Sequence, residues 1–92
     1  MATTYSKRQL MQYILGLCAR DEACRIENAY FADRAVLQAI QEATDELIEI
    51  YLAGLMSFPL RNRFEWCLRV KPYLRQRVAR ARLTRHKLRS GH

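Results

Sequence analysis

The sequence predicts an all-α fold built from two tandem three-helix units that share a long central helix. The 92 residues include only three Gly and two Pro. Apolar residues recur at three- and four-residue spacing, as on one face of a helix, and β-branched residues are not concentrated in any segment. The stretch YILGL at 13–17 returns as YLAGL at 51–55, an interval of 38 residues. A repeat of this kind indicates a duplicated structural unit.

The repeat extends well beyond these five letters. At the same interval Gly16 aligns with Gly54, Glu27 aligns with Glu65, and apolar character is kept where identity is lost. The two copies span about residues 6–43 and 44–82 of a single domain, and a basic helix end occupies 83–92. We therefore expect equivalent helices in the two copies.

Three helices are predicted in the first copy. Ser6 can cap the first helix, and Gly16 permits a turn near its end. Asp21 and Glu22 place negative charge at the start of the second helix, and Asp33 can cap the third. The apolar positions of the three helices are Leu10, Tyr13, Ile14 and Leu17, then Cys24, Ile26 and Tyr30, then Val36, Leu37 and Ile40.

The third helix of the first copy is predicted to continue into the first helix of the second copy. No breaker lies between RAVLQAIQEA and TDELIEIYLAGL, so one long helix can run over residues 33–54, with Thr44 as the most favourable place for a break. Ser57 and Pro59 start the next helix, and Pro72 begins the last. The apolar positions of these two helices are Phe64, Trp66, Cys67 and Leu68, then Leu74, Val78, Ala81 and Leu88.

Composition restricts the class of protein. No apolar run approaches the roughly 18 to 20 residues of a membrane span, and MATTYSKRQL lacks the apolar stretch of a signal peptide. Three cysteines, Cys18, Cys24 and Cys67, fit reduced thiols better than a disulfide framework. We therefore expect a cytoplasmic protein.

The net charge of +7 is placed unevenly. Residues 1–60 carry five basic and eight acidic side chains, whereas residues 61–92 carry eleven and one. The last helix therefore offers a basic surface, which can be a solvated helix end or can contact the backbone of a nucleic acid. Its residues are Arg75, Arg77, Arg80, Arg82, Arg85, Lys87 and Arg89.

The second copy, DELIEIYLAGLMSFPLRNRFEWCLRVKPYLRQRVARAR, resembles the degenerate, tandem zinc-finger domain of bacterial anti-sigma factors. The similar features are the acidic start, the YL-x-G-x-L ending, the helix ending in R-F-E, the turn with Pro and the Arg-rich helix. IENAYFADRAVLQAI resembles the matching part of the first copy. The resemblance implies a protein that packs helices against a sigma factor or another transcription regulator.

The zinc ligands of that family are lost here. Its zinc-binding members have a His two residues after the Glu and a Cys-x-x-Cys that opens the third helix. The equivalent positions hold Ala29 and Cys67 for the His, then Asp33, Val36, Lys71 and Leu74 for the two Cys. Because zinc needs four Cys, His or carboxylate donors in tetrahedral reach, we expect neither a metal nor another cofactor.

No catalytic arrangement emerges, since the chain has no nucleophile triad in sequence order, no phosphate-binding Gly-rich loop and no dinucleotide fingerprint. We therefore expect no catalytic residues and no enzyme. Tyr13, Tyr51, Phe64 and Trp66 are interpreted as core side chains rather than a ligand cage, because of their helical spacing.

Two groups of side chains are candidates for contact with a partner. Phe31 and Phe58 lie at predicted helix junctions, where each can pack as a staple or anchor a partner. Glu42, Glu46 and Glu49 recur along the central helix, where they form either a solvated face or an acidic ridge for a basic partner helix.

The favoured function is a non-enzymatic protein-binding module, similar to an anti-sigma factor, with a sigma factor or an RNA polymerase subunit as partner. Two alternatives remain at this point. The basic last helix can bind nucleic acid, or the chain can be a homo-oligomeric adaptor.

Overall fold

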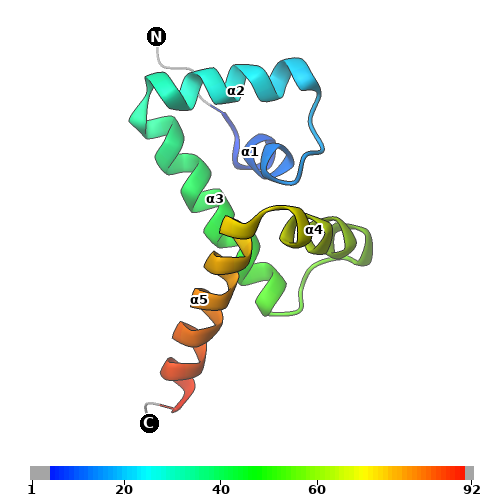
Figure 1. The fold of residues 1–92 in the computed structure, drawn as a ribbon, viewed down its shortest axis with the longest axis vertical. Helices are drawn as coiled ribbons and strands as arrows, with labels where there is room; N and C mark the ends of the chain where they lie inside the picture. Colours follow the sequence, from blue (N-terminus) through cyan, green and yellow to red (C-terminus); the bar gives the residue numbers. More distant parts are fainter. Residues whose placement is uncertain (1–4, 91–92) are drawn as a thin grey trace. The chain divides into compact units, whose positions relative to one another are not determined.

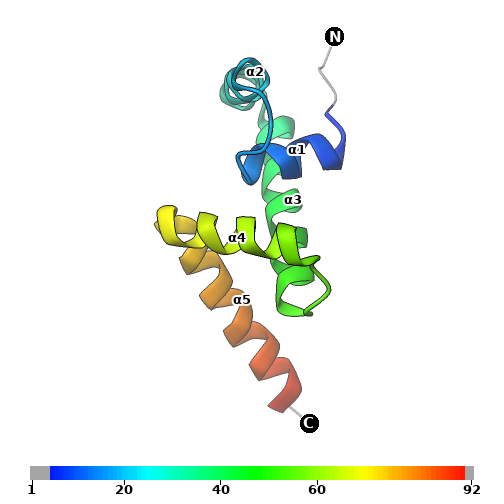
Figure 2. The same cartoon turned by 90° about the vertical axis from the view of Figure 1, so that its right-hand side faces the viewer.

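The computed structural model describes residues 5–90, and the side chains of residues 5–85, as helices joined by short turns (Figures 1 and 2). The helices are α1 (Lys7–Ile14), α2 (Arg20–Ala32), α3 (Arg34–Leu52), α4 (Phe58–Val70) and α5 (Pro72–Ser90). Over this described part of the chain there is no strand. The predicted all-α class is confirmed.

The chain divides into two compact units, unit 1 (Met1–Leu47) and unit 2 (Ile48–His92). The boundary falls inside α3, which is one continuous helix. The break considered at Thr44 is absent, because the Thr44 hydroxyl donates a hydrogen bond to the Ile40 carbonyl at 2.8 Å and its side chain is buried. In that position the hydroxyl is satisfied inside the helix rather than at a cap.

The first and third helices of unit 1 have the predicted caps. The Ser6 hydroxyl accepts from the Gln9 N–H at 3.1 Å, and the Gln9 side chain accepts from the Ser6 N–H at 2.8 Å, which completes a capping box. Asp33 ends α2 and accepts from the Ala35 N–H at 2.9 Å at the start of α3. The buried apolar side chains of unit 1 are Leu10, Ile14, Leu15, Ile26, Val36, Ala43 and Leu47.

In unit 2, α4 and α5 contact each other and are joined by a sharp corner at Lys71 (Figure 2). Pro72 is the first residue of α5, as predicted, and Ser57 is the N-cap of α4 without a side-chain hydrogen bond. The buried apolar side chains of this unit are Ile48, Phe64, Cys67, Leu74 and Val78.

Glycine ends α1 and α3 in the same way. Gly16 and Gly54 have φ of 71° and 73°, the left-handed region that favours glycine. The N–H groups of Gly16 and Leu17, and of Gly54 and Leu55, donate to carbonyls of the preceding helical turn at 2.8 to 3.1 Å. Each helix therefore ends in a Schellman motif, which satisfies its last carbonyls.

The bounds of the later helices recur at an interval of 38 residues. α2 and α4 have 13 residues each, and α3 and α5 have 19 each. The corner residues Asp33 and Lys71 adopt similar extended conformations, with φ of −136° and −122°. Ile26 in α2 and Phe64 in α4, which are 38 residues apart, are both fully buried.

Four of the predicted apolar positions are on the surface. Leu17, just beyond the end of α1, is 53% exposed, Leu37 is 37% exposed, Trp66 is 42% exposed, and Cys24 is exposed as well. Phe64 and Trp66 are two positions apart on one α-helix and therefore point about 200° apart, so they cannot share a buried face. Phe64 occupies the core, while Tyr13 and Tyr51 are half-buried.

Candidate interaction surface

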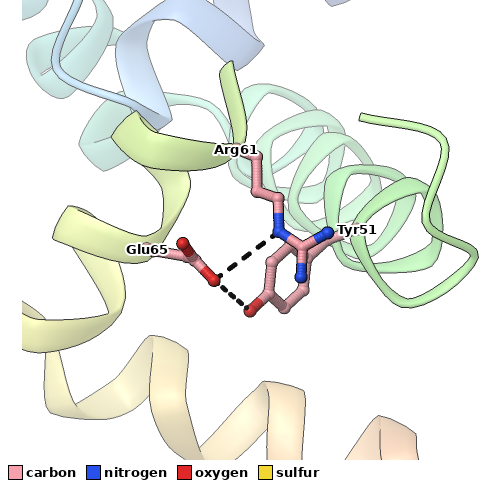
Figure 3. A network of polar contacts seen from close by, with 3 residues as sticks. All are labelled: Tyr51, Arg61 and Glu65. Atoms are coloured by element: carbon pink, nitrogen blue, oxygen red, sulfur yellow. Dashed lines mark hydrogen bonds and ion pairs between the residues drawn. The ribbon is translucent and has the colours of Figure 1, made fainter. Parts of the chain in front are cut away.

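One face of α4 is tied to the end of α3 by a polar cluster (Figure 3). The Tyr51 hydroxyl donates to the Glu65 carboxylate at 3.1 Å, and Arg61 Nε lies 3.7 Å from the same carboxylate. The Arg61 guanidinium also lies over the Tyr51 ring, 5.6 Å from its centre, and the Tyr51 and Phe64 rings are 4.7 Å apart. This cluster positions α4 within unit 2 and engages the carboxylate that α4 carries.

The cluster changes the acidity of its tyrosine. Burial, and then the hydrogen bond to Glu65 and its negative charge, raise the pKa of Tyr51 above its usual value. Burial disfavours the charged form of the hydroxyl, and the nearby carboxylate disfavours a second negative charge beside it. The hydroxyl is thus held as a hydrogen-bond donor, which is a structural role rather than that of a reactive base.

The opposite side of α4 exposes large apolar side chains. Trp66 and Val70 are one turn apart on α4 and are 42% and 50% exposed. Tyr73, in the first turn of α5, is 55% exposed. Trp66 and Val70 share one side of α4, and Tyr73 follows them just past the corner at Lys71.

Arginines lie beside these apolar side chains. The Arg63 guanidinium lies over the Trp66 ring, 4.3 Å from its centre, as a cation–π pair. Arg69 is exposed on the same side of α4, and Arg75 of α5 reaches back to donate to the Arg69 carbonyl at 3.0 Å. We call these side chains together the Trp66 surface: Arg63, Trp66, Arg69, Val70, Tyr73 and Arg75.

The Trp66 surface carries three arginines, and its own helices supply one acidic side chain over the described residues. Over residues 58–85 the sequence contains one carboxylate, Glu65, and that group is engaged with Tyr51 and Arg61. An arrangement with exposed aromatic and aliphatic side chains, and with arginines beside them, is typical of sites that bind another macromolecule.

The equivalent positions in unit 1 show that the fold does not require these apolar side chains. The residues 38 positions before Trp66, Val70 and Tyr73 are Asn28, Ala32 and Ala35. Helices with the same bounds are therefore formed with small or polar side chains at these places. The shared helix bounds therefore do not depend on large apolar side chains at Trp66 and Val70.

The aromatic residues predicted to contact a partner are on the surface. Phe31, in the last turn of α2, is 79% exposed and stacks on Tyr30 with ring centres 4.7 Å apart. Phe58, the first residue of α4, is 76% exposed. Phe31 belongs to unit 1 and Phe58 to unit 2.

The predicted acidic residues have nearby partners within their own units. Glu46 pairs with Lys7 at 2.7 Å, a contact that raises the pKa of Lys7, and Glu49 pairs with Arg85 at 3.3 Å. Glu42 accepts a hydrogen bond from the Gln38 side chain at 3.4 Å. The pairs at Glu46 and Glu49 reduce the negative charge that α3 presents to a partner.

The predicted basic surface follows α5. Arg75, Arg80 and Arg82 are exposed, and Arg77 and Arg85 are half-buried. The side chains of Lys87 and Arg89 lie outside the described residues. The sequence indicated α5 as the basic element, whereas the position of Arg63 over the exposed Trp66 ring is visible only in the structure.

Within the described residues, no helix is long and apolar enough to span a membrane. The same residues include no group of three or more His, Cys, Asp or Glu side chains that could hold a metal ion.

A comparison with known protein families, with curated proteins and with solved structures finds no match to this chain.

Proposed function

We propose that the chain is a non-enzymatic module that binds a protein partner, and that α4 of unit 2 carries the main contact. The observation that supports this most strongly is the Trp66 surface, where a Trp, a Val and a Tyr are 42 to 55% exposed. Burying such side chains removes apolar area from water, at about 25 cal/mol per Å². Trp, Tyr and Arg are also the residues that most often dominate the affinity of an interface.

The same proposal describes the architecture as two tandem three-helix units that share α3. The second half of α3 takes the place of α1 in the second unit. The recurrence of helix bounds at 38 residues and the Schellman motifs at Gly16 and Gly54 support this description. A duplicated scaffold can keep its core in both copies while one copy acquires a binding surface.

The resemblance to anti-sigma factors suggests the class of partner. On that basis the partner is a sigma factor or an RNA polymerase subunit, and binding acts on transcription. This part of the proposal rests on the resemblance of sequence motifs alone, because no family, curated protein or solved structure matches the chain.

Affinity purification from the native cell, with and without nuclease, tests the proposal. We expect a protein to survive nuclease treatment and then to bind the purified chain directly with one-to-one stoichiometry. Recovery of proteins only without nuclease would contradict it, as would a captured protein that does not bind the purified chain.

Direct binding of nucleic acid by α5 is the second candidate. It is favoured by the exposed arginines Arg75, Arg80 and Arg82, which could neutralise phosphates. Purification with nuclease separates binding of nucleic acid from binding of a protein partner, since a complex mediated by nucleic acid is lost when the nucleic acid is digested.

A further inference from the structure

We propose that the Trp66 surface binds an acidic amphipathic segment of the partner, taken up as a helix. This inference rests on the proposed function and specifies the chemistry of its partner. The apolar face of the segment contacts Trp66 and Val70, and its carboxylates pair with Arg69 and Arg75.

The apolar part of the surface suits a helix rather than an extended strand. The described residues contain no strand, so an extended peptide finds no sheet edge whose backbone it could continue. A helix satisfies its own backbone hydrogen bonds and presents side chains at three- and four-residue spacing. Trp66 and Val70 have that same spacing on α4 and can interdigitate with it.

The charged part of the surface selects an acidic segment. The exposed Arg69 and Arg75 bring two guanidinium groups to the surface, and Arg75 lies there through its hydrogen bond to the Arg69 carbonyl. That carbonyl is a neutral acceptor, so the hydrogen bond leaves the charge of Arg75 uncompensated. Guanidinium groups bind carboxylates with two parallel hydrogen bonds, whereas a basic segment would be repelled.

Two features favour a protein segment over a single-stranded nucleic acid at this surface. Single-strand binding relies on free aromatic faces on which bases stack. Here the Arg63 guanidinium, 4.3 Å from the centre of the Trp66 ring, covers one face of it. Val70 beside it is an aliphatic contact, which matches a Leu or Ile side chain better than a base or a phosphate.

Selection from a displayed library tests this proposal without knowledge of the partner. Random segments of roughly 20 residues, enough for a helix of about 30 Å, are panned against the intact chain with soluble Trp66→Ala protein as competitor. We expect the selected segments to carry Leu, Ile or Phe at helical spacing and an excess of Asp and Glu. Segments without acidic bias, or no segment that depends on Trp66, would overturn the proposal.

Matched variants then locate the contact. Trp66→Ala should weaken a selected peptide roughly tenfold or more, while Leu83→Ala, which truncates a side chain that is 63% exposed further along α5, should leave affinity within about twofold. Arg69→Gln with Arg75→Gln should weaken it more than Arg80→Gln with Arg82→Gln, although both pairs remove the same charge. Equal losses within each comparison would contradict the assigned surface, and unchanged circular dichroism of each variant excludes unfolding.

The outcome separates this inference from the proposed function. A nuclease-resistant partner whose binding is unaffected by Trp66→Ala would overturn the inference and leave the protein-binding function standing. Oligothymidine that competes with the selected peptide and loses affinity in Trp66→Ala would instead assign the surface to single-stranded nucleic acid.

Discussion

Among single residues, two glycines end helices α1 and α3, and one tyrosine links α3 to α4. Gly16 and Gly54 adopt φ of 71° and 73°, a region in which a side chain is strained. Around Gly54 there is open space, so strain there comes from the backbone conformation and not from a steric clash. The sequence predicted a turn at both residues, and the positive φ gives the physical reason.

We expect Gly16→Val and Gly54→Val to lower the free energy of unfolding by about 1 to 3 kcal/mol each, because a β-branched residue is strained at positive φ. Gly16→Asn and Gly54→Asn are the matched controls, since Asn tolerates this conformation and should cost less. Thermal and urea unfolding of the four variants measure the differences. Equal stability of the Val and Asn variants would contradict the left-handed conformation at these turns.

Tyr51 makes stability depend on pH in the alkaline range. Its pKa in the folded protein is raised above 10.0, so the stabilisation from the neutral hydroxyl is complete below that value and is lost as pH rises through the folded pKa. The free energy of unfolding should therefore fall more steeply above pH 10 in the wild type than in Tyr51→Phe. Urea unfolding over pH 8 to 11 measures how the free energy of unfolding depends on pH, and Tyr30→Phe is the control for the loss of one hydroxyl. Parallel curves for wild type and Tyr51→Phe would contradict the contact with Glu65.

At the level of helices, the sequence allowed several caps and turns to be predicted, but not the end of α1 or every exposed face. Ser6, Asp33, Gly16 and Pro72 have local signatures, because caps and turns are set by a few neighbouring residues. The interpretation of Trp66 as a core side chain was wrong, because two positions on a helix separate it from the buried Phe64 by about 200°. The reach of Arg75 to the Arg69 carbonyl depends on the corner between two helices, so no local pattern reveals it.

The continuity of α3 can be tested with proline. Thr44→Pro should destabilise the protein by about 3 kcal/mol or more, because proline inside a helix removes a backbone hydrogen bond and clashes with the preceding turn. Arg34→Pro is the control, since residue 34 is the first of α3, where proline is favoured, and Pro72 begins α5 in the same way. Asp33 already has the extended conformation that a following proline requires. A tolerated Thr44→Pro would indicate two helices rather than one.

At the scale of the whole molecule, the uneven charge raises the question of which macromolecule the chain binds. The basic residues of α5 and those of the Trp66 surface attract either phosphates or carboxylates, and charge alone does not distinguish the two. The exposed apolar side chains next to the arginines favour a protein partner. Their burial against a protein contributes a binding free energy that salt does not screen. Our account therefore gives the arginines a role in steering and selecting a protein partner.

Mobility shifts of random-sequence duplex DNA and of oligothymidine over a series of salt concentrations decide between a protein and a nucleic acid as the partner. We expect no stable complex of the purified chain at about 150 mM salt, and only weak complexes at low salt that Arg80→Gln, Arg82→Gln and Arg85→Gln abolish together. A complex at physiological salt, with a log–log slope of several ions that falls in the triple variant, would contradict this expectation and assign the chain to nucleic-acid binding.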